Sequence, residues 1–403
     1  MVLRLLLMAS LLPVAASAQT PAVCDPYEGP RLRGYLGAMH EHSSYSDGDI
    51  FAVPRDYFEV GKARGLHYMG SAEHSDTYDR GNFVSVGSDC FSTPDGLLTC
   101  LGVNDDRLAK WEATARQVGE VSDERFVAVR GFEWTSDRFG HINVYFSQNF
   151  SNAKTDLGYV ALLEPFWEWL VRDPATPGLG GSATSPVPFG GGGDGLAHFN
   201  HPGDKCLDAA DPGCNWFDFE YVPEADAQMF GIELFNPGGD DRYEPFYIRA
   251  LDRGWHVGAV AAEDEHGIRW ADPARAKTVT LMPSLSRENL KAAWAARRTY
   301  ALSTAQSPRI LRFEAEGHPM GSRLRCEAGG RVRVLARLSP RGEPFSGTLE
   351  LVSRGGEVVA GSSGPRLVAR LTVTDEERWY YLRARGADGR LLTVSSPVWI
   401  APR

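Results

Sequence analysis

Residues 35–48 read YLGAMHEHSSYSDG, in which an apolar segment leads directly into polar side chains. The segment Tyr35–Met39 has the length and composition of a buried strand. His40 and His42 follow at its carboxyl end. Because residues two apart in an extended chain point to the same side, both imidazoles can reach one metal ion. This stretch therefore predicts a strand that ends in a pair of metal ligands.

A short apolar strand followed by an amphipathic helix recurs between residues 34 and 307. Repeated strand–helix units favour a mostly parallel sheet, as a barrel or an open sandwich, with ligands at the carboxyl ends of the strands. The predicted strands are Tyr35–Met39, Tyr68–Ala72, Phe126–Val129, Ile142–Phe146, Leu196–Phe199, Gly231–Leu234, Val257–Ala262 and Thr278–Met282. The predicted helices are Pro54–Arg64, Arg107–Val118, Glu164–Arg172, Glu244–Arg253 and Ser286–Arg298.

After residue 307 the sequence changes to short segments that alternate apolar and polar residues between Gly, Pro and Asp turns. Seven such segments predict an antiparallel sandwich of immunoglobulin-like type. They are 309–315, 331–338, 347–353, 357–360, 366–373, 378–384 and 391–399. We therefore expect a first domain at 19–307 and a β-sandwich domain at 308–403.

The two ends of the sequence and its cysteines indicate an exported protein. Residues 1–18, with one positive charge, a short apolar run and a final Ala-Ser-Ala, have the form of a secretory signal peptide. Six cysteines without a C-x-x-C motif fit an oxidising compartment, so we expect a secreted or periplasmic protein. Fifteen pairings are open on sequence alone. Proximity favours Cys90–Cys100, Cys206–Cys214 and, by elimination, Cys24–Cys326.

Composition and charge exclude several classes of protein. With 43% hydrophobic and 11% aromatic residues in 403, the chain is not a disordered polymer. Its 42 Lys and Arg against 52 Asp and Glu give a formal charge of −10, so we expect no nucleic-acid partner. No segment after the signal peptide approaches the ~20 apolar residues of a membrane span, so we expect no stable membrane insertion. A local basic pocket for an anionic substrate stays open.

Histidines gather at the predicted strand ends. Nine of the ten lie between residues 40 and 266, and six of those stand at or beside a carboxyl end. One such histidine alone is more often a core residue, but so many polar groups buried in one cleft would be costly without a cation. Imidazole and carboxylate ligands without thiolate suit zinc, manganese or iron(II), and their number predicts two or three ions. The pieces are His40-Glu41-His42, Glu73-His74-Ser75-Asp76, Gly131-Phe132-Glu133, Gly140-His141, His198-Phe199-Asn200-His201 and Asp264-Glu265-His266.

Taken in order, these pieces resemble the polymerase-and-histidinol-phosphatase (PHP) superfamily of metal-dependent hydrolases, over roughly residues 35–305. Residues 37–48 are similar to its opening motif, usually Gly-Asp-Leu-His-x-His-Thr followed by Ser-Asp-Gly. The motifs at 140–144 and 200–202, with a trailing β domain, resemble the secreted carbaryl-hydrolase-like (CehA/McbA-type) branch. The resemblance implies an α/β fold with a distorted (β/α)7-type barrel followed by a small antiparallel β-sandwich.

The resemblance also implies which residues hold divalent ions. Two ions sharing Glu133 would hold a bridging water and lower its pKa toward neutrality, which produces the attacking hydroxide. Asp264 or His266 would carry the proton to the leaving group. The implied ligand sets are His40, His42, Glu133 and Asp264 for the first ion, Glu133, His141 and His201 for the second, and Asp47, His74 and His266 for the third.

Two motifs depart from the superfamily pattern. The usual Thr-Asp-His is Ala72-Glu73-His74, and the usual Ser-Asp-x-His is Glu263-Asp264-Glu265-His266. We expect the added carboxylates to make the mouth of the site acidic, which disfavours a highly charged phosphate monoester. Glu233 stays ambiguous between a site role and a structural one. The candidate substrate-binding residues are Arg269, Arg138, Arg242 and His198.

Three functions follow from these residues. We expect first a secreted phosphoesterase, with phosphodiesters preferred, acting on a small-molecule or a glycan- or lipid-linked ester. The alternative is a carbamate, amide or carboxylic ester hydrolase of carbaryl-hydrolase type. The third is a non-catalytic surface module with structural metal ions, which closed coordination by protein ligands would identify.

Overall fold

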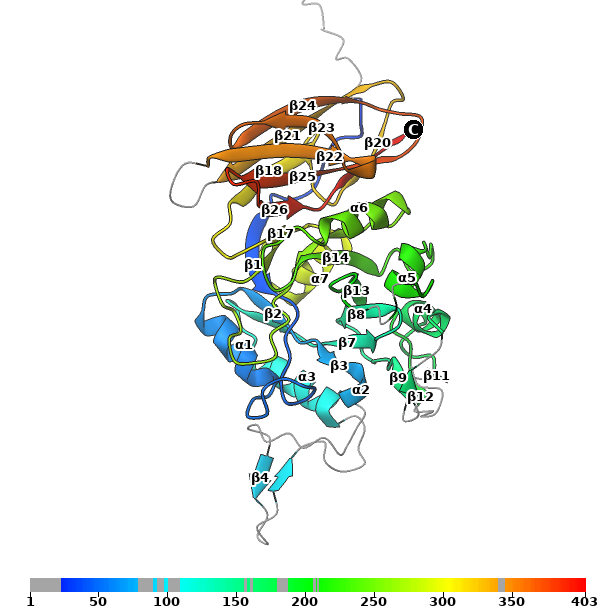
Figure 1. Cartoon of the computed structure of the whole chain (residues 1–403), viewed down its shortest axis with the longest axis vertical. Helices are drawn as coiled ribbons and strands as arrows, with labels where there is room; N and C mark the ends of the chain where they lie inside the picture. The colour runs from blue at the N-terminus through cyan, green and yellow to red at the C-terminus, as the bar shows by residue number, and fades with distance from the viewer. Residues whose placement is uncertain are drawn as a thin grey trace, which may run out of the picture.

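The computed structural model describes residues 23–78, 90–92, 98–100, 109–155, 158–159, 162–179, 188–205, 208, 210–339 and 345–403. A mixed α/β body and a β-sandwich lie end to end along the long axis of the molecule (Figure 1). The expected signal segment and the expected partner Cys206 lie outside the described residues.

A six-stranded sheet carries most of the polar strand ends. Three of its strands, β13, β14 and β15, are parallel, and so are β3 and β7. Strand β8 runs antiparallel to both of its neighbours, β7 and β13. The order is β15 (Gly258–Ala261), β14 (Met229–Phe235), β13 (Leu196–Phe199), β8 (Gly140–Tyr145), β7 (Gly131–Ser136) and β3 (Glu73–His74).

An eleven-stranded sheet begins in the same body and continues into the sandwich. Its first strands are β6 (Val127–Val129), β2 (Tyr68–Gly70), β1 (Arg33–Ala38), β16 (Lys277–Met282) and β17 (Thr299–Leu302). It continues through β26 (Leu391–Ser395), β25 (Arg378–Gly386), β27 (Val398–Pro402) and β20 (Arg323–Cys326), with β22 (Gly347–Ser353) and β23 (Glu357–Ser362) beyond β25. Because β17 pairs with β26, main-chain hydrogen bonds cross the expected boundary at residue 307.

The helices lie close to their predicted positions. Helix α1 begins at Pro54, where Asp56 Oδ2 accepts the Val53 N–H at 2.7 Å, and Gly65 follows its end with φ 80°. No helix in the described part of the chain is long and apolar enough to span a membrane. The helices are α1 (Pro54–Ala63), α2 (Ser75–Tyr78), α3 (Ala109–Val121), α4 (Glu164–Val171), α5 (Cys214–Phe219), α6 (Glu244–Asp252) and α7 (Arg287–Ala295), with a 3-10 turn at Arg354–Gly356. Short strand pairs are β4 (Cys90–Ser92) with β5 (Leu98–Cys100), β9 (Lys154–Thr155) with β10 (Gly158–Tyr159), and β11 (Gly178–Leu179) with β12 (Pro188–Phe189).

The eleven-stranded and six-stranded sheets that the structure describes are both open, and no closed barrel is found among the described strands. The sheets of the α/β body are mixed: β1–β2, β2–β6, β3–β7, β13–β14 and β14–β15 are parallel, as expected, whereas β1–β16, β16–β17, β7–β8 and β8–β13 are antiparallel. For β7 and β8 the reason lies in chain length: only residues 137–139 separate them, and a parallel connection needs a crossover of a dozen residues or more.

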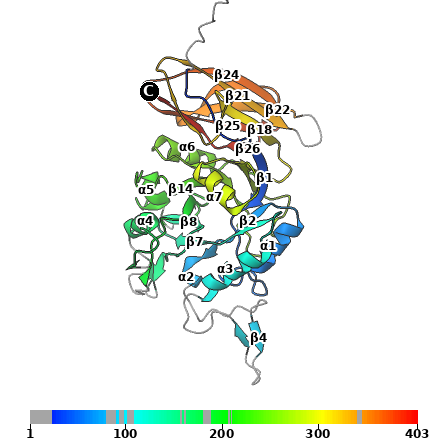
Figure 2. The same cartoon turned by 180° about the vertical axis from the view of Figure 1, so that it is seen from behind.

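The second layer of the sandwich is a four-stranded antiparallel sheet. Its order is β19 (His318–Pro319), β18 (Arg309–Ala315), β21 (Arg331–Ser339) and β24 (Arg366–Thr372). The last predicted segment, 391–399, divides into β26 and β27 on either side of Ser396-Pro397. Strands β21 and β24 lie at the end of the molecule remote from α1 to α5, as both views show (Figures 1 and 2).

The sandwich packs on helix α6 of the α/β body. Tyr381 donates a hydrogen bond to Glu244 at 2.8 Å, and Trp379 Nε1 donates to Asp252 at 3.2 Å. Trp379 and Tyr381 belong to the same buried core as Tyr247 and Leu251 of α6. The body and the sandwich therefore share one hydrophobic core across the continuous sheet.

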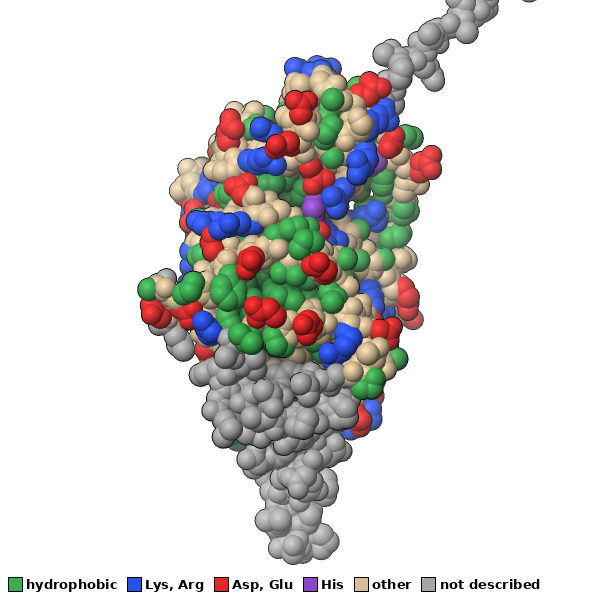
Figure 3. Space-filling model, turned by 90° about the vertical axis from the view of Figure 1, so that its right-hand side faces the viewer, with side chains coloured by type: hydrophobic (Ala, Val, Ile, Leu, Met, Phe, Trp, Pro, Cys, Tyr) green, Lys and Arg blue, Asp and Glu red, His purple; other side chains and the backbone are tan. Residues whose placement is uncertain are grey.

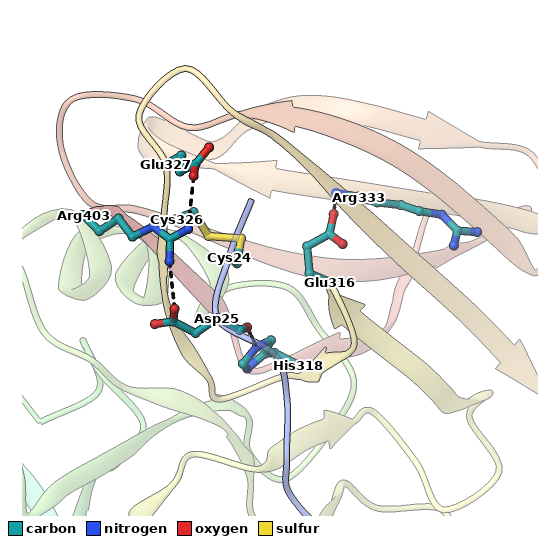
Figure 4. The surroundings of a disulfide bond; sticks show 8 residues. All are labelled: Cys24, Asp25, Glu316, His318, Cys326, Glu327, Arg333 and Arg403. Carbon is teal, nitrogen blue, oxygen red and sulfur yellow. Dashed lines mark hydrogen bonds and ion pairs between the residues drawn. A yellow bond between two sulfur atoms is a disulfide. The ribbon is translucent and has the colours of Figure 1, made fainter. Parts of the chain in front are cut away.

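One disulfide ties the start of the described chain to the sandwich. Cys24 is bonded to Cys326, a separation of 302 residues, which is the pairing expected by elimination. Arg403 reinforces this junction with ion pairs to Asp25 at 2.8 Å and Glu327 at 3.4 Å (Figure 4). Cys90 and Cys100 stand opposite each other in the β4–β5 pair, and Cys214 is also disulfide-bonded.

A buried histidine links the body to the sandwich and predicts a pH dependence. His256 Nδ1 contacts Asp226 and its Nε2 contacts Glu377 of the sandwich, both at 2.8 Å. Burial alone would lower the pKa of His256, but these carboxylates outweigh it and raise that pKa. The charged pairs therefore stabilise the fold fully below about pH 6.5, and this stabilisation is lost as the pH rises through the folded-state pKa.

We expect the stability difference between wild type and His256→Gln to narrow as the pH rises from 6 to 9. Urea unfolding of both proteins across this range measures it. His318→Gln is the control, because its ring contacts the backbone oxygen of Asp25 in place of a carboxylate. A difference that is constant or widens with pH would contradict the ion-pair role.

Candidate metal centre

The predicted ligands come together at the ends of β1, β3, β13 and β15 and along β7 and β8. His40 and His42 follow β1 and are fully buried. Asp264 follows β15, and its N–H donates to the carbonyl of His40 at 2.9 Å, which fixes one motif against the other. The chain turns sharply at His201 (φ 21°) and at Asp264 (φ 49°), and these unusual backbone conformations aim both side chains at the same centre.

Glu133 and Asp264 form the inner part of the cluster with the histidines that follow β1. His40 Nε2 lies 3.4 Å from Glu133 Oε1 and 3.4 Å from Asp264 Oδ1. His42 Nε2 lies 3.2 Å from Asp264 Oδ1 and 3.9 Å from Glu133 Oε2. These four residues are the set that the resemblance implies for a first ion.

Glu133 also lies at the centre of the remaining inner ligands. His141 Nδ1 is 2.9 Å and His201 Nε2 is 3.3 Å from Glu133 Oε1, and His74 Nδ1 is 2.7 Å from Oε2. The ligand atoms group as His74, Glu133 and His141, and separately as His40, His201 and Asp264. The structure thus places His74 beside the implied second set, and His201 between the second set and Asp264 of the first, at 3.3 Å from Glu133 and 3.9 Å from Asp264.

Four residues form the outer, more exposed part of the cluster. Asp47 Oδ1 lies 3.3 Å from His266 Nε2, and Oδ2 lies 3.4 Å from His74 Nε2. His42 Nδ1 completes this group at 3.8 Å from Asp47. Asp47 is 54% exposed and His266 is 40% exposed, so this edge of the cluster opens to solvent. It contains all three ligands that the resemblance implies for a third ion.

The donor atoms fit divalent cations. His40 Nε2 and His42 Nε2 are buried beside the cluster's carboxylates and have no hydrogen-bond partner among the described residues, a costly state for polar atoms. Burial and the neighbouring His266 lower the pKa of His42 to about 3, which leaves its imidazole neutral, as metal binding requires. Burial alone would raise the pKa of Glu133, but the surrounding imidazoles hold it well below its ordinary value.

Glu233, ambiguous from the sequence, supports the ligands from behind. Its Oε1 accepts a hydrogen bond from His40 Nδ1 at 2.8 Å, which turns Nε2 toward the cluster. Its Oε2 accepts bonds from the His201 N–H at 2.8 Å and from Asn236 Nδ2 at 2.9 Å. A carboxylate that orients a ligating histidine in this way raises the histidine's basicity toward a metal. The only sequence signal was its position on a strand adjoining the histidine strands.

We expect Glu233→Gln to weaken metal affinity about 10- to 100-fold, because the amide orients His40 less strongly than the carboxylate does. Competition with a chelator measures this affinity. Glu168→Gln, an exposed position on α4, is the matched control. Wild-type affinity in Glu233→Gln would show that the His40–Glu233 contact does not tune the site.

The added carboxylates of the two departing motifs do not form an acidic mouth, contrary to expectation. Glu73 is buried and accepts hydrogen bonds from Ser43 N–H (3.0 Å), Ser43 Oγ (2.5 Å) and Ser46 Oγ (2.5 Å). Glu265 is ion-paired with Arg275, and Glu263 with Lys277. All three point into the protein, where Glu73 holds the loop that carries His42 and Asp47.

The four candidate substrate-binding residues occupy different environments. Arg138 pairs with Asp211 at 2.9 Å, and Arg242 pairs with Asp204 at 3.2 Å, so both charges are already balanced. His198 is fully buried, with Tyr145 at 3.3 Å and Glu233 at 3.9 Å, and it lies behind the ligands. Arg269 is exposed, and its guanidinium forms no ion pair with any described residue. Of the four, Arg269 alone offers a free charge near the ligand motif.

A strained turn packs beside His141. Residues 215–219, in α5, all have φ between 51° and 59°, a left-handed conformation that costs about 1–2 kcal/mol per residue. The turn holds Trp216 against Gly140, where a Cβ atom would lie 2.7 Å from the indole ring, so only glycine fits before His141. Trp216 also lines a surface cavity of about 380 Å³ between α4 and α5, in an apolar area bordered by acidic side chains (Figure 3).

Comparison with family models and with curated proteins finds no match. Among solved structures, the chain is similar to a two-domain protein containing a predicted PHP-like metal-dependent phosphoesterase from Bacteroides vulgatus ATCC 8482. The identity is 16% and the TM-score 0.45, with 94% of this chain and 100% of that chain covered. Fibronectin(III)-like modules of CbhA from Clostridium thermocellum (12% identity, TM-score 0.19) match 24% of this chain and 97% of theirs. CopC from Methylosinus trichosporium OB3b (13%, 0.17) matches 24% of this chain and 95% of its own.

Proposed function

We propose that the chain is an exported, metal-dependent phosphoesterase of PHP type, from the carbaryl-hydrolase-like branch, with phosphodiesters as preferred substrates. The observation that carries this proposal is the cluster of nine imidazole and carboxylate side chains, in which the buried Nε2 atoms of His40 and His42 have no hydrogen-bond partner among the described residues. The open edge at Asp47 and His266 argues against a purely structural metal site, since such sites are closed by protein ligands.

Divalent ions held by this cluster supply Lewis acidity and lower the pKa of a coordinated water toward neutrality. The protein's own contribution is charge and position. Three carboxylates, Asp47, Glu133 and Asp264, against two divalent ions would leave the loaded centre with one net positive charge, which the single negative charge of a phosphodiester balances. Because the carboxylates of Glu73, Glu263 and Glu265 point inward, they do not oppose it.

The more exposed candidate ligands, Asp264 and His266, are placed to transfer a proton to the leaving group. Asp264 is 21% exposed and its Oδ2 accepts a hydrogen bond from Asn236 at 3.2 Å, which holds the carboxylate in place. His266 lies at the solvent edge, 3.3 Å from Asp47. We assign these two residues to the proton that the leaving group needs. Arg269, just beyond His266 in the sequence, would contact the charged group of the substrate.

A substrate panel tests this proposal. Protein purified without chelator would be analysed for zinc, manganese and iron, and then assayed with an aryl phosphodiester, an aryl phosphomonoester and an aryl carbamate. We expect bound metal and fastest turnover of the diester. Turnover of the carbamate alone would favour the alternative, a carbamate or carboxylic ester hydrolase. Bound metal without any turnover would favour the structural module and overturn the enzymatic proposal.

A further inference from the structure

The charges of the chain are strongly segregated along its length. Residues 19–307 contain 25 Lys and Arg against 42 Asp and Glu, whereas residues 308–403 contain 16 Arg and no Lys against 10 Asp and Glu. The acidic total of −10 therefore conceals a sandwich of charge +6. The net charge of the whole chain argued against an anionic partner, but that argument holds for the α/β body and not for the sandwich.

Six of these arginines lie on one exposed face of the four-stranded sheet. Strand β21 alternates exposed arginines with buried Val332, Val334, Ala336 and Leu338, so its arginines share the solvent face. Arg312 pairs with Glu314 at 2.6 Å, while Arg337, Arg366 and Arg370 form no ion pair with any described residue. The side chain of Arg333 extends away from Glu316, which contacts its backbone N–H (Figure 4). The face consists of Arg312 on β18, Arg331, Arg333 and Arg337 on β21, and Arg366 and Arg370 on β24.

The register of the sheet sets these arginines directly opposite one another. Arg312 stands opposite Arg337, and Arg337 opposite Arg366, which makes a row across three strands. Arg333 stands opposite Arg370 in a second row. Like charges in directly opposed cross-strand positions destabilise a sheet. Charge on an edge strand guards against aggregation, which accounts for the arginines of β24 but not for those of the central strand β21.

Between the two arginine rows lies a third row, which begins with Glu314 of β18, the ion-pair partner of Arg312, and continues with two aliphatic side chains. Leu335 of β21 stands opposite Val368 of β24, and Val368 is 59% exposed. The described residues of this face include no aromatic side chain, which is the usual platform for stacked bases. Guanidinium groups flanking exposed aliphatic groups match the phosphates and the acyl boundary of an anionic lipid surface.

We propose that this arginine face is a docking surface for a membrane rich in anionic phospholipid. The face lies at the end of the sandwich remote from α1 to α5, so docking there leaves the α/β body projecting from the surface (Figure 1). Repulsion between the opposed arginines lowers the stability of the free protein, and their role in binding anionic lipid explains why they are present. The contact is peripheral and reversible, and needs no membrane-spanning segment.

Vesicle co-sedimentation of the full chain tests the proposal. We expect binding to vesicles of three parts phosphatidylcholine to one part phosphatidylglycerol at low salt. Binding should disappear at high salt and with phosphatidylcholine alone, because it depends on charge. Arg337→Gln with Arg370→Gln removes one arginine from each row and should weaken binding roughly 30-fold. Arg116→Gln with Arg125→Gln, at exposed positions of the α/β body, changes net charge equally and should bind like wild type.

Thermal unfolding supplies a second readout. We expect the Arg337→Gln, Arg370→Gln protein to unfold at or above the wild-type temperature, because like-charge repulsion is relieved. Wild-type vesicle binding by that variant, or no sedimentation of the wild type with anionic vesicles, would overturn the proposal. Binding to heparin or duplex DNA without sedimentation on vesicles would also overturn it, in favour of a soluble polyanion.

Discussion

Replacing both His40 and His42 with alanine is expected to remove bound metal and lower kcat/KM by about 10³-fold or more. Both imidazoles lie within 3.4 Å of Asp264 Oδ1, so their loss leaves the buried carboxylates of the inner cluster without the ligands that share a cation with them. Stabilisation of transition-state charge by a catalytic metal is worth several kcal/mol, which corresponds to at least three powers of ten in rate.

Metal analysis and turnover of the best substrate in the panel measure this effect. His318→Ala is the control, because that histidine lies on the sandwich and contacts only backbone and Tyr27. Circular dichroism at matched temperature separates loss of the ligands from loss of the fold. Wild-type metal content and turnover in the folded double variant would refute the metal-centre assignment.

Replacing Lys277 with methionine is expected to lower the free energy of unfolding by about 3–5 kcal/mol at neutral pH. Lys277 is fully buried, pairs with Glu263 and donates to the backbone oxygen of Arg275 at 3.2 Å. Burial and the charge of Glu263 raise the pKa of Glu41 well above its ordinary value, because this pocket disfavours buried negative charge. Removing the cation leaves a second buried carboxylate, Glu263, uncompensated.

Urea unfolding at several pH values tests this expectation. The deficit of Lys277→Met should shrink as the pH falls, because the carboxyl of Glu263 then takes up a proton and carries no buried charge. Lys62→Met is the control, since its pair with Asp123 is exposed and its loss should barely change stability. A deficit that is small at neutral pH, or that grows in acid, would contradict the buried-charge argument.

The sequence predicts much of the local structure, and also the clustering of the imidazole and carboxylate side chains, for a shared physical reason. Hydrophobic periodicity places the helices and strands, as with Leu196–Phe199, which coincides with β13. Polar residues that directly follow such strands lie at the carboxyl ends of the strands, which meet at one edge of a parallel sheet. The histidines and acidic residues of distant motifs can therefore be assigned to one site from the sequence. The same reasoning does not fix pairing direction, and the short turn at 137–139 made β8 antiparallel.

The direction of a carboxylate depends on partners that are distant in the sequence. Glu73 and Glu265 adjoin predicted ligands, yet Ser43 and Arg275 draw them into the protein. Glu233 lies 193 residues from His40, and no spacing rule connects them. The arginine rows likewise arise from strand register, since Arg337 and Arg366 become neighbours only when β21 pairs with β24.

The pairing of β17 with β26 has a practical consequence for dissecting the protein. A fragment ending near residue 307 would expose β17 as a bare sheet edge, with unpaired N–H and C=O groups beside uncovered α6 side chains. Such an edge recruits strands from other molecules, so the excised fragment should aggregate. We therefore expect that the α/β body does not fold stably without the β-sandwich, so functional studies require the intact polypeptide.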